Sequence, residues 1–378
     1  MWFRGHKSQA LTHLCCGFFA KFTGLNFKTQ TMTISFPKLT PGVHVYVRDD
    51  ETSQIGLDPS SALMVDAKLL RLLLPLLDGQ HSFEELVQSA QANQIETTSM
   101  FNFLELLESA TLITCECVNQ ASASNLQTND IQRISLQRET RENSNKMLRR
   151  ASTEVSIYGA GRLGTTISLL LASSGYPMLR VIDSVAVGAA DVTPWGASRI
   201  DIGVRRDTVA MQIIERVARG SSGRNSYLRF SPKLRLAILV PDQVADSPWM
   251  DPLASEQFLA NDIPHLVAAL ATKECQVSSI ILPGQTPCIR CEYQRHCDID
   301  PAWPRITQQL LSKVPQDLAS SSLVMRSALF VVQQIDQWVE TEAVTSNQIN
   351  VLRQNESDVI AMPIDIHPSC GCAWDRVA

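Results

Sequence analysis

A glycine-rich segment at residues 159–164 constrains the fold more than any other feature of the sequence. It reads Gly-Ala-Gly-Arg-Leu-Gly and directly follows the strand-like run EVSIY, which ends at Tyr158. Glycines permit a tight turn and a close approach of the backbone, and a helix that begins there presents free N–H groups to a phosphate. Gly159, Gly161 and Gly164 therefore predict a nucleotide-binding turn between a strand and a helix.

An acidic residue follows at the spacing that such a turn requires. Asp183 ends the next strand-like run, MLRVID, roughly 20 residues after the last glycine. A carboxylate at this position can accept hydrogen bonds from ribose hydroxyls, and an exposed strand-end carboxylate is the alternative. The motif alone does not distinguish NAD from ATP.

Strands and helices alternate from residue 154 onward. Apolar runs at KLRLAILVPD, PHLVAAL and QVSSIILPG predict further strands, and helical patterns occur at TTISLLLASSG, TVAMQIIERVARG and residues 321–341. Alternation of this kind predicts an α/β fold with a mostly parallel, doubly wound sheet. We therefore expect residues 151–378 to form a Rossmann-like nucleotide-binding domain.

Residues 33–118 predict a smaller α+β domain. The runs at 43–47 and 54–57 indicate two strands, and the apolar stripe at 62–79 indicates a helix that stops at Gly79. Ser82 and Glu85 have the spacing of a capping box before a second helix. A third helix is expected at 97–110 and a closing strand at LITCECV. This order of elements is typical of a winged-helix-like module.

Composition limits the remaining classes of protein. The chain has 378 residues, 44% of them hydrophobic, and a net charge of −5, so it can bury sizeable cores but lacks a basic footprint for nucleic acid. It has no uninterrupted apolar run of the ~18 residues that a membrane span needs. Residues 119–150 are polar and predict a linker, and residues 1–32 predict a disordered or spurious extension, with Met1 or Met32 as the initiator. A cytoplasmic location is expected.

Two close cysteine pairs predict a metal site. Cys288 and Cys291 are expected in a proline-rich loop, and Cys370 and Cys372 in another. Two such pairs far apart in the sequence suit a structural zinc site with four thiolates, which leaves no open position for water. A redox CxxC pair is the alternative, and nearby His296 or His367 could replace a ligand. Cys297 is a candidate nucleophile, with a bystander thiol as the simpler interpretation.

Together these motifs resemble the superfamily of ThiF, MoeB and the ubiquitin-activating enzymes. The segments at 183–196, 283–291, 298–304 and 367–374 resemble actinobacterial ThiF-like proteins in which a PqqD-like domain that binds leader peptides precedes the ThiF-like domain. The resemblance implies ATP and magnesium as cofactors, adenylation of a carboxylate, and a homodimer. It also implies a precursor peptide or small carrier protein as partner, with a modifying enzyme as a further one.

The resemblance also assigns residues. Arg206 falls on the family's lysine, Asp242 is the nearest candidate for its metal-binding aspartate, and Asp246 is the second. Active members carry an Asn followed by an Arg-Gln pair after the ribose-binding acid, whereas residues 188–194 here read GAADVTP. An ATP-dependent adenylyltransferase is therefore one hypothesis, and a catalytically degenerate scaffold that binds leader peptides is the other.

Two further classes are less consistent with the sequence. The glycine segment also allows an NAD-dependent oxidoreductase, but no catalytic histidine–acid arrangement supports one. A winged helix can bind DNA, but acidic residues in 33–118, among them Asp49, Asp50 and Glu51, oppose contact with phosphates.

Overall fold

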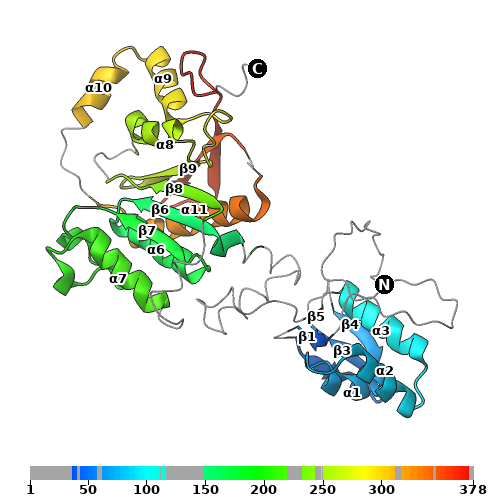
Figure 1. Cartoon of the computed structure of the whole chain (residues 1–378). Helices are drawn as coiled ribbons and strands as arrows, with labels where there is room; N and C mark the ends of the chain where they lie inside the picture. The colour runs from blue at the N-terminus through cyan, green and yellow to red at the C-terminus, as the bar shows by residue number, and fades with distance from the viewer. Residues whose placement is uncertain are drawn as a thin grey trace.

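The computed structural model describes residues 36–40, 43–57, 62–110, 112–115, 146, 149–218, 232–242, 248, 250–310, 317–343 and 346–373. The expected extension at 1–32, most of the expected linker and Asp246 lie outside these residues. Over the described residues the strands form one seven-stranded sheet and two smaller sheets (Figure 1). No helix among them is long and apolar enough to cross a membrane.

The two smaller sheets lie in the N-terminal third of the chain. Strand β1 (Pro37–Leu39) pairs antiparallel with β5 (Ile113–Cys115), and β2 (Val45–Val47), β3 (Thr52–Ile55) and β4 (Leu63–Asp66) form an antiparallel meander. The helical elements between β4 and β5 are α1 (Ala67–Leu73), the short 3-10 helix η1 (Leu74–Leu76), α2 (Phe83–Ala92) and α3 (Thr97–Ser109).

The start of α1 differs from the sequence expectation. Residues 63–66 were expected to belong to the helix, but they pair with β3 as strand β4. The reason is local, because the Asp66 carboxylate accepts a hydrogen bond from the Leu69 amide at 2.8 Å and caps α1 there. The capping box of Ser82 and Glu85 is confirmed, since both of its hydrogen bonds are present at the start of α2.

The large sheet has the strand order β12-β11-β10-β9-β8-β6-β7. Its strands are β6 (Thr153–Tyr158), β7 (Met178–Ile182), β8 (Leu234–Leu239), β9 (His265–Leu270), β10 (Glu274–Ser278), β11 (Gln348–Arg353) and β12 (Val359–Pro363). Strands β7, β6, β8 and β9 pair in parallel, and β10 to β12 are added antiparallel. The chain passes from β6 to β7 on one side and then to β8 on the other, so the topological switch point lies between β6 and β8.

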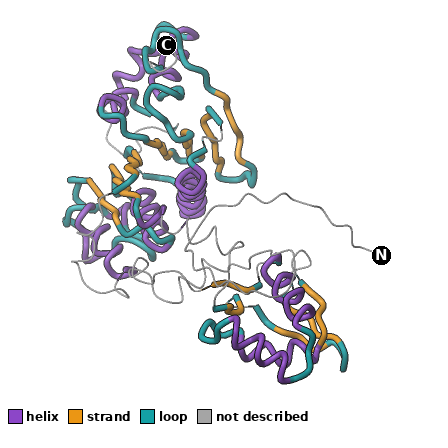
Figure 2. The backbone as a smooth tube through the Cα atoms, turned by 45° about the vertical axis from the view of Figure 1, so that its right-hand side comes forward, coloured by secondary structure: helices purple, strands orange, loops and turns teal. Residues whose placement is uncertain are grey.

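Helices cover both faces of this sheet. One face packs against α6 (Arg162–Ser173) and α11 (Ser321–Thr341), and α7 (Arg206–Ala218) lies beside α6. The other face packs against α8 (Glu256–Ala260), which follows the 3-10 helix η6 (Pro252–Ser255), and against α9 (Ile289–Ile299), with α10 (Trp303–Leu310) next to α9. Figure 2 shows the strands between these helical layers.

Alternate residues of the central strands explain the two covered faces. In β8, Leu236 and Ile238 join the core under α6 and α11, while Ala237 and Leu239 join the core under α8 and α9. A strand that is buried on both faces has a continuous apolar sequence, as in LAIL at residues 236–239. The expected doubly wound α/β sheet is therefore the fold of this part of the chain.

Candidate nucleotide and metal sites

The first and last glycines of the segment are required by backbone packing. Gly159 follows β6 with φ +104°, and a Cβ there would lie 1.9 Å from the carbonyl oxygen of Val240. A Cβ at Gly164 would lie 1.9 Å from the carbonyl oxygen of Gly159. The turn thus packs against the end of β8 and against the first turn of α6, at the switch point of the sheet.

Gly161 has a different environment. A Cβ there would meet nothing nearer than Asp242 Oδ1 at 3.7 Å and Asp191 Oδ1 at 3.9 Å. Gly161 is also the N-cap residue of α6, whose first N–H groups have no partner within the helix. Packing therefore does not require a glycine at position 161, and the residue lies at a helix N-terminus, where free N–H groups can bind a phosphate.

The Asp183 carboxylate is hydrogen-bonded to the glycine loop. Its Oδ2 accepts a hydrogen bond from the Ala160 amide at 2.7 Å, and its Oδ1 accepts one from the Val185 amide at 2.9 Å. Only 7% of the side chain is exposed, so the alternative of an exposed strand-end carboxylate is wrong. The sheet brings Asp183 beside the loop, as the spacing in the sequence predicts.

Arg206 lies at the centre of three carboxylates. Its Nε donates to Asp191 Oδ2 at 2.9 Å, and its Nη1 donates to Asp242 Oδ1 at 2.8 Å. Asp183 Oδ2 is 3.7 Å from the same Nη1. Arg206 and Asp242 are thus brought together with Asp183, as the sequence assignments require, but Asp191 was not singled out from the sequence.

The charges around Arg206 do not balance. One guanidinium faces three carboxylates, which leaves a formal charge of −2 at the edge of the glycine loop. Burial raises the pKa of Asp242, Asp183 and Asp191 raise it further, and the opposing effect of Arg206 does not cancel this rise. Burial also opposes the charged form of Arg206, but Asp191 and Asp242 outweigh it and raise the arginine pKa. Without a further cation, the group of Arg206 and its three carboxylates therefore attracts cations and repels a phosphate.

A second arginine of the loop is already neutralised. Arg162 Nε donates to Asp317 Oδ2 at 2.8 Å, its Nη2 donates to the same carboxylate, and Nη2 also donates to the Ala319 carbonyl at 2.6 Å. Only 10% of its side chain is exposed. Arg162 therefore ties the glycine loop to the segment before α11, and its charge is not available to a ligand in this arrangement.

The four predicted cysteines form one cluster. Cys288 is the N-cap residue of α9 and Cys291 lies in its first turn, so the first pair is on a helix start and not in the loop that the prolines suggested. The Sγ atoms of Cys288 and Cys370 are 3.5 Å apart, those of Cys291 and Cys372 are 3.3 Å apart, and all four lie within 4.8 Å of one another. Hydrogen bonds among the thiols raise the pKa of Cys288 and lower that of Cys291. This cluster can hold a metal ion.

The neighbouring histidines have other partners. His367 Nε2 lies 2.8 Å from Asp298 Oδ2, and its Nδ1 accepts a hydrogen bond from the Ser369 amide at 3.2 Å. The His296 ring stacks on Trp303 with 4.7 Å between centroids. Among the described residues, the group with metal-ligand geometry consists of the four cysteines and contains no histidine.

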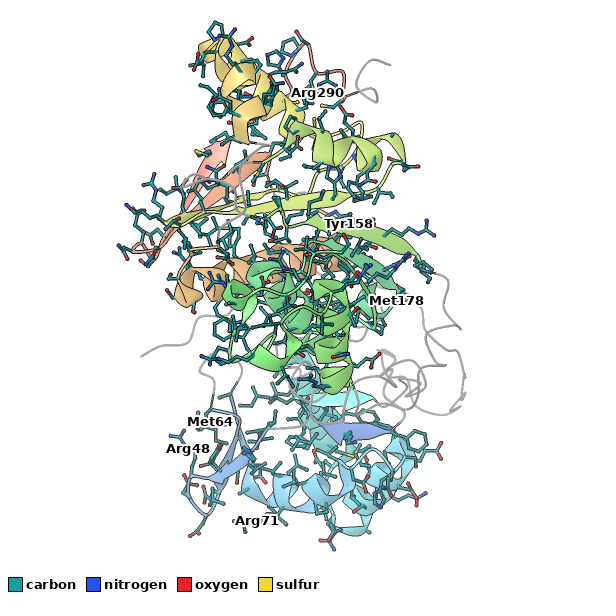
Figure 3. All side chains as sticks on the ribbon, turned by 90° about the vertical axis from the view of Figure 1, so that its left-hand side faces the viewer. Arg48, Met64, Arg71, Tyr158, Met178 and Arg290 are labelled. Atoms are coloured by element: carbon teal, nitrogen blue, oxygen red, sulfur yellow. The ribbon has the colours of Figure 1, made fainter. Side chains whose placement is uncertain are left out.

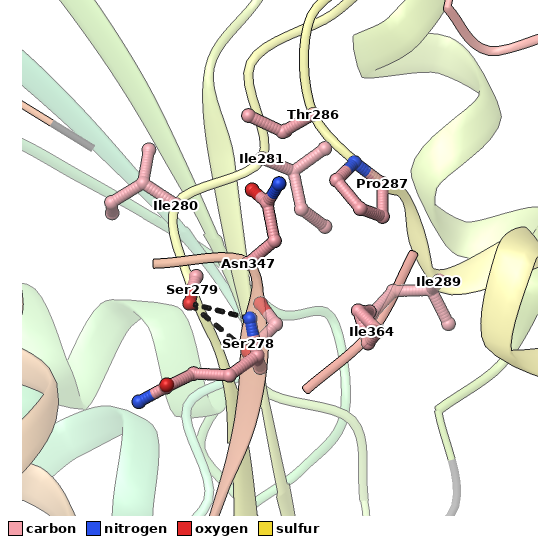
Figure 4. Close-up of a pocket in the computed structure, with 10 residues that line it drawn as sticks. Ser278, Ser279, Ile280, Ile281, Thr286, Pro287, Ile289, Asn347 and Ile364 are labelled. Carbon is pink, nitrogen blue, oxygen red and sulfur yellow. Dashed lines mark hydrogen bonds between the residues drawn. The ribbon is translucent and has the colours of Figure 1, made fainter. Parts of the chain in front are cut away.

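A hollow next to β10 and β11 offers no chemistry of its own. Its lining includes Ser279, Thr286 and Asn347, and none of the residues that line it is titratable (Figure 4). Ser279 Oγ donates to the Gln348 carbonyl at 3.0 Å and accepts from the Gln348 amide at 3.2 Å, so it joins two strand ends. Tyr158, which precedes the glycine loop at the end of β6 (Figure 3), packs against the same core cluster as Ile281, Ile289 and Ile364 of this lining.

A glycine turn at the switch point, an acid at the end of the next strand and a four-cysteine cluster define an α/β protein with nucleotide-fold geometry and a metal-type thiol site. The ThiF family model matches residues 132–372, and the chain belongs to the ThiF family. No curated protein sequence matches the chain significantly.

Solved structures share this architecture across most of the chain. MccB of E. coli, solved with AMPCPP and selenomethionine MccA, is 15% identical, has a TM-score of 0.56, and is matched over 89% of this chain and 99% of MccB. The complex of MccB with ATP gives a TM-score of 0.55 at 15% identity over the same shares of the two chains. PaaA is 18% identical with a TM-score of 0.54 over 85% of this chain and 98% of PaaA. At these identities the likeness shows the fold.

Proposed function

We propose that the chain binds ATP at the glycine loop and adenylates the carboxylate of a bound peptide or small protein. The observation that carries this proposal is the convergence of Gly161, Asp183 and Arg206 at the N-terminus of α6 in a chain of the ThiF family. Two structures of one relative in fold support it, since MccB, described as a microcin C7 biosynthetic enzyme, has been solved with N-formylated MccA and with ATP.

Each residue of the site has a role in this proposal. The N–H groups at the start of α6 bind the phosphates, Asp183 accepts from the ribose hydroxyls, and Arg206 faces the charge that develops when pyrophosphate leaves. ATP supplies the AMP group that becomes attached to the carboxylate oxygen as its bond to pyrophosphate breaks. Asp242 is the carboxylate best placed to hold magnesium, because 35% of its side chain is exposed whereas 5% of Asp191 is.

Residues 33–118 are proposed to recognise the peptide as a PqqD-like domain. Strands β2 and β4 are the outer strands of their meander, so each has an edge that can add a further strand. Tyr46, Gln54 and Met64 stand next to one another across that sheet, and 36% of Tyr46 and 59% of Met64 are exposed. An extended leader peptide would gain backbone hydrogen bonds at such an edge and apolar contact on this face.

A scaffold without catalysis is the second candidate. The observation that favours it is the set of three carboxylates around Arg206, together with the segment GAADVTP in place of the family's Asn and Arg. In that case residues 33–118 bind the leader peptide, and the ThiF-like domain holds it for a partner modifying enzyme. A cytoplasmic homodimer with zinc in the cysteine cluster belongs to both candidates.

Pyrophosphate exchange separates the two candidates. With peptides that bind the full chain, an adenylating enzyme exchanges labelled pyrophosphate into ATP, and Arg206→Ala should lower that rate by about tenfold or more because it removes a cation from the reacting phosphate. Arg205→Ala is the matched control, since Arg205 pairs with Asp207 and 60% of its side chain is exposed. Peptide binding without any exchange in the wild type would reject the enzyme and leave the scaffold.

A further inference from the structure

The two carboxylates that bind Arg206 are not equivalent. Asp191 is 5% exposed, and its Oδ2 accepts from the Gly188 amide at 2.8 Å as well as from Arg206 Nε. The Asp191 carboxylate is therefore fixed by the short 3-10 helix η3 (Ala189–Asp191), of which it is the last residue. A buried carboxylate that is held by the backbone is a rigid partner for a guanidinium.

Asp242 is the more exposed partner. Its side chain is 35% exposed and follows β8, and its Oδ1 lies 2.8 Å from Arg206 Nη1. The same oxygen is the nearest atom to the space above Gly161, at 3.7 Å from the position of a Cβ. An anion that enters this space thus meets the Asp242 carboxylate, which is hydrogen-bonded to the Arg206 guanidinium.

We propose that Asp191 is the positioning residue that keeps Arg206 over the glycine loop, and that Asp242 is an exchangeable partner which Arg206 leaves only when a divalent cation takes that carboxylate. This inference rests on the proposed binding of ATP. Binding of the phosphates and binding of the cation are then coupled, because metal-free phosphate faces a site whose formal charge is −2. Removing the negative charge of Asp242 should therefore favour phosphate binding in the same way as a bound cation does.

The test is ATP binding to the full chain, measured by calorimetry in EDTA and in magnesium. The wild type should bind ATP about tenfold or more tightly in magnesium than in EDTA. Asp242→Asn should reduce that ratio to about twofold or less, chiefly by tightening the binding in EDTA. Asp207→Asn is the matched control, because it also removes one negative charge at this edge but Asp207 pairs with Arg205, so its ratio should stay that of the wild type.

The role of Asp191 needs a measurement that distinguishes the positioning of Arg206 from a general loss of stability. Asp191→Ala should bind ATP more weakly than Asp191→Asn both with and without magnesium, because the two variants remove the same charge but only the alanine deprives Arg206 of its fixed partner. Asp191→Asn should restore the affinity, since its amide oxygen can still accept from Gly188 and Arg206. Thermal unfolding of both variants reports any loss of fold separately.

Four results would overturn the inference. They are a magnesium ratio below about twofold in the wild type, an unchanged ratio in Asp242→Asn, the same collapse of the ratio in Asp207→Asn, and equal ATP affinity in Asp191→Ala and Asp191→Asn. Asp242→Ser replaces Asp242→Asn if the latter does not fold. A wild type that binds no ATP in either buffer would overturn the proposed nucleotide binding as well, whereas the four results above leave that binding intact.

Discussion

The three glycines of the loop differ in what a side chain would do at each. At Gly159 a Cβ meets the Val240 carbonyl oxygen, which belongs to the backbone and cannot move away cheaply, and φ is +104°. At Gly161 the nearest atoms are carboxylate oxygens in ordinary van der Waals contact. Within one motif, Gly159 is thus required by the fold, whereas Gly161 is proposed to be required for binding the phosphates.

Substitution by alanine should separate these requirements. We expect Gly161→Ala to fold with a melting temperature near that of the wild type but to lose ATP affinity by about tenfold or more, because its methyl group occupies the proposed phosphate space. Gly159→Ala should lose stability by several kcal/mol, about what overpacking costs at a site that cannot relax. Calorimetry and thermal unfolding measure the two effects, and a Gly161→Ala protein that binds ATP like the wild type would contradict the assignment.

Sequence reasoning found the residues that recur in spaced motifs and missed those that act through contacts. Gly159, Gly164 and Asp183 could be placed because the turn and the next strand fix their separation. Asp191 lies in the irregular segment after β7, where no periodicity predicts which side chain turns inward. The partner of Arg162, Asp317, is 155 residues away along the chain, and only the packed fold brings the two together.

At the scale of elements, the cysteine cluster joins the start of α9 to the loop after β12. The N-cap of a helix and its first turn place the Sγ atoms of Cys288 and Cys291 4.0 Å apart, and Cys370 and Cys372 approach from the other segment. The pairs were predictable from their spacing, but the helix was not, because the preceding prolines favoured a loop. At strand β4 the sequence predicted a helix where the structure has a strand. The apolar residues form one uninterrupted stripe there, although the chain changes from strand to helix at Asp66.

We expect the purified chain to contain one zinc ion, which the double variant Cys370→Ser/Cys372→Ser loses. Four thiolates bind zinc in a closed tetrahedral site, and removal of two of them leaves too few ligands. Metal analysis measures the zinc, and thermal unfolding measures the stability that the site gives to α9. Cys297→Ser is the matched control on the same helix, since Cys297 is not part of the cluster, and it should keep the metal. Full zinc retention in the double variant would reject this site.

At the scale of the whole molecule, a buried polar network ties the chain before β6 to α11. Arg150 Nη2 lies 3.2 Å from Asp336 Oδ2, and the Tyr176 hydroxyl donates to Asp336 Oδ1 at 2.9 Å. Arg150 also pairs with Glu340 and donates to the Ser174 carbonyl at 2.8 Å. The network therefore fixes the entry of the chain into the large sheet, just before β6 begins.

Asp336 makes the stability of this unit depend on pH. Burial raises the pKa of Asp336 to about 6, although Arg150 and the Tyr176 hydroxyl lower it and Glu340 raises it further. The unfolded carboxyl has its ordinary pKa of 3.8, so between these values the folded state binds more protons than the unfolded state. The free energy of unfolding must then fall as pH rises through that window.

Asp336→Asn should remove this dependence. Relative to the variant, we expect the wild type to lose on the order of 2 kcal/mol of stability between pH 4 and pH 7, as a pKa shift of this size implies. Denaturant unfolding at a series of pH values measures the difference. Asp201→Asn is the control with the opposite sign, because hydrogen bonds from Ser198 lower the pKa of the exposed Asp201 carboxyl. Parallel curves for the wild type and Asp336→Asn across this range would show that the buried network does not titrate as its geometry requires.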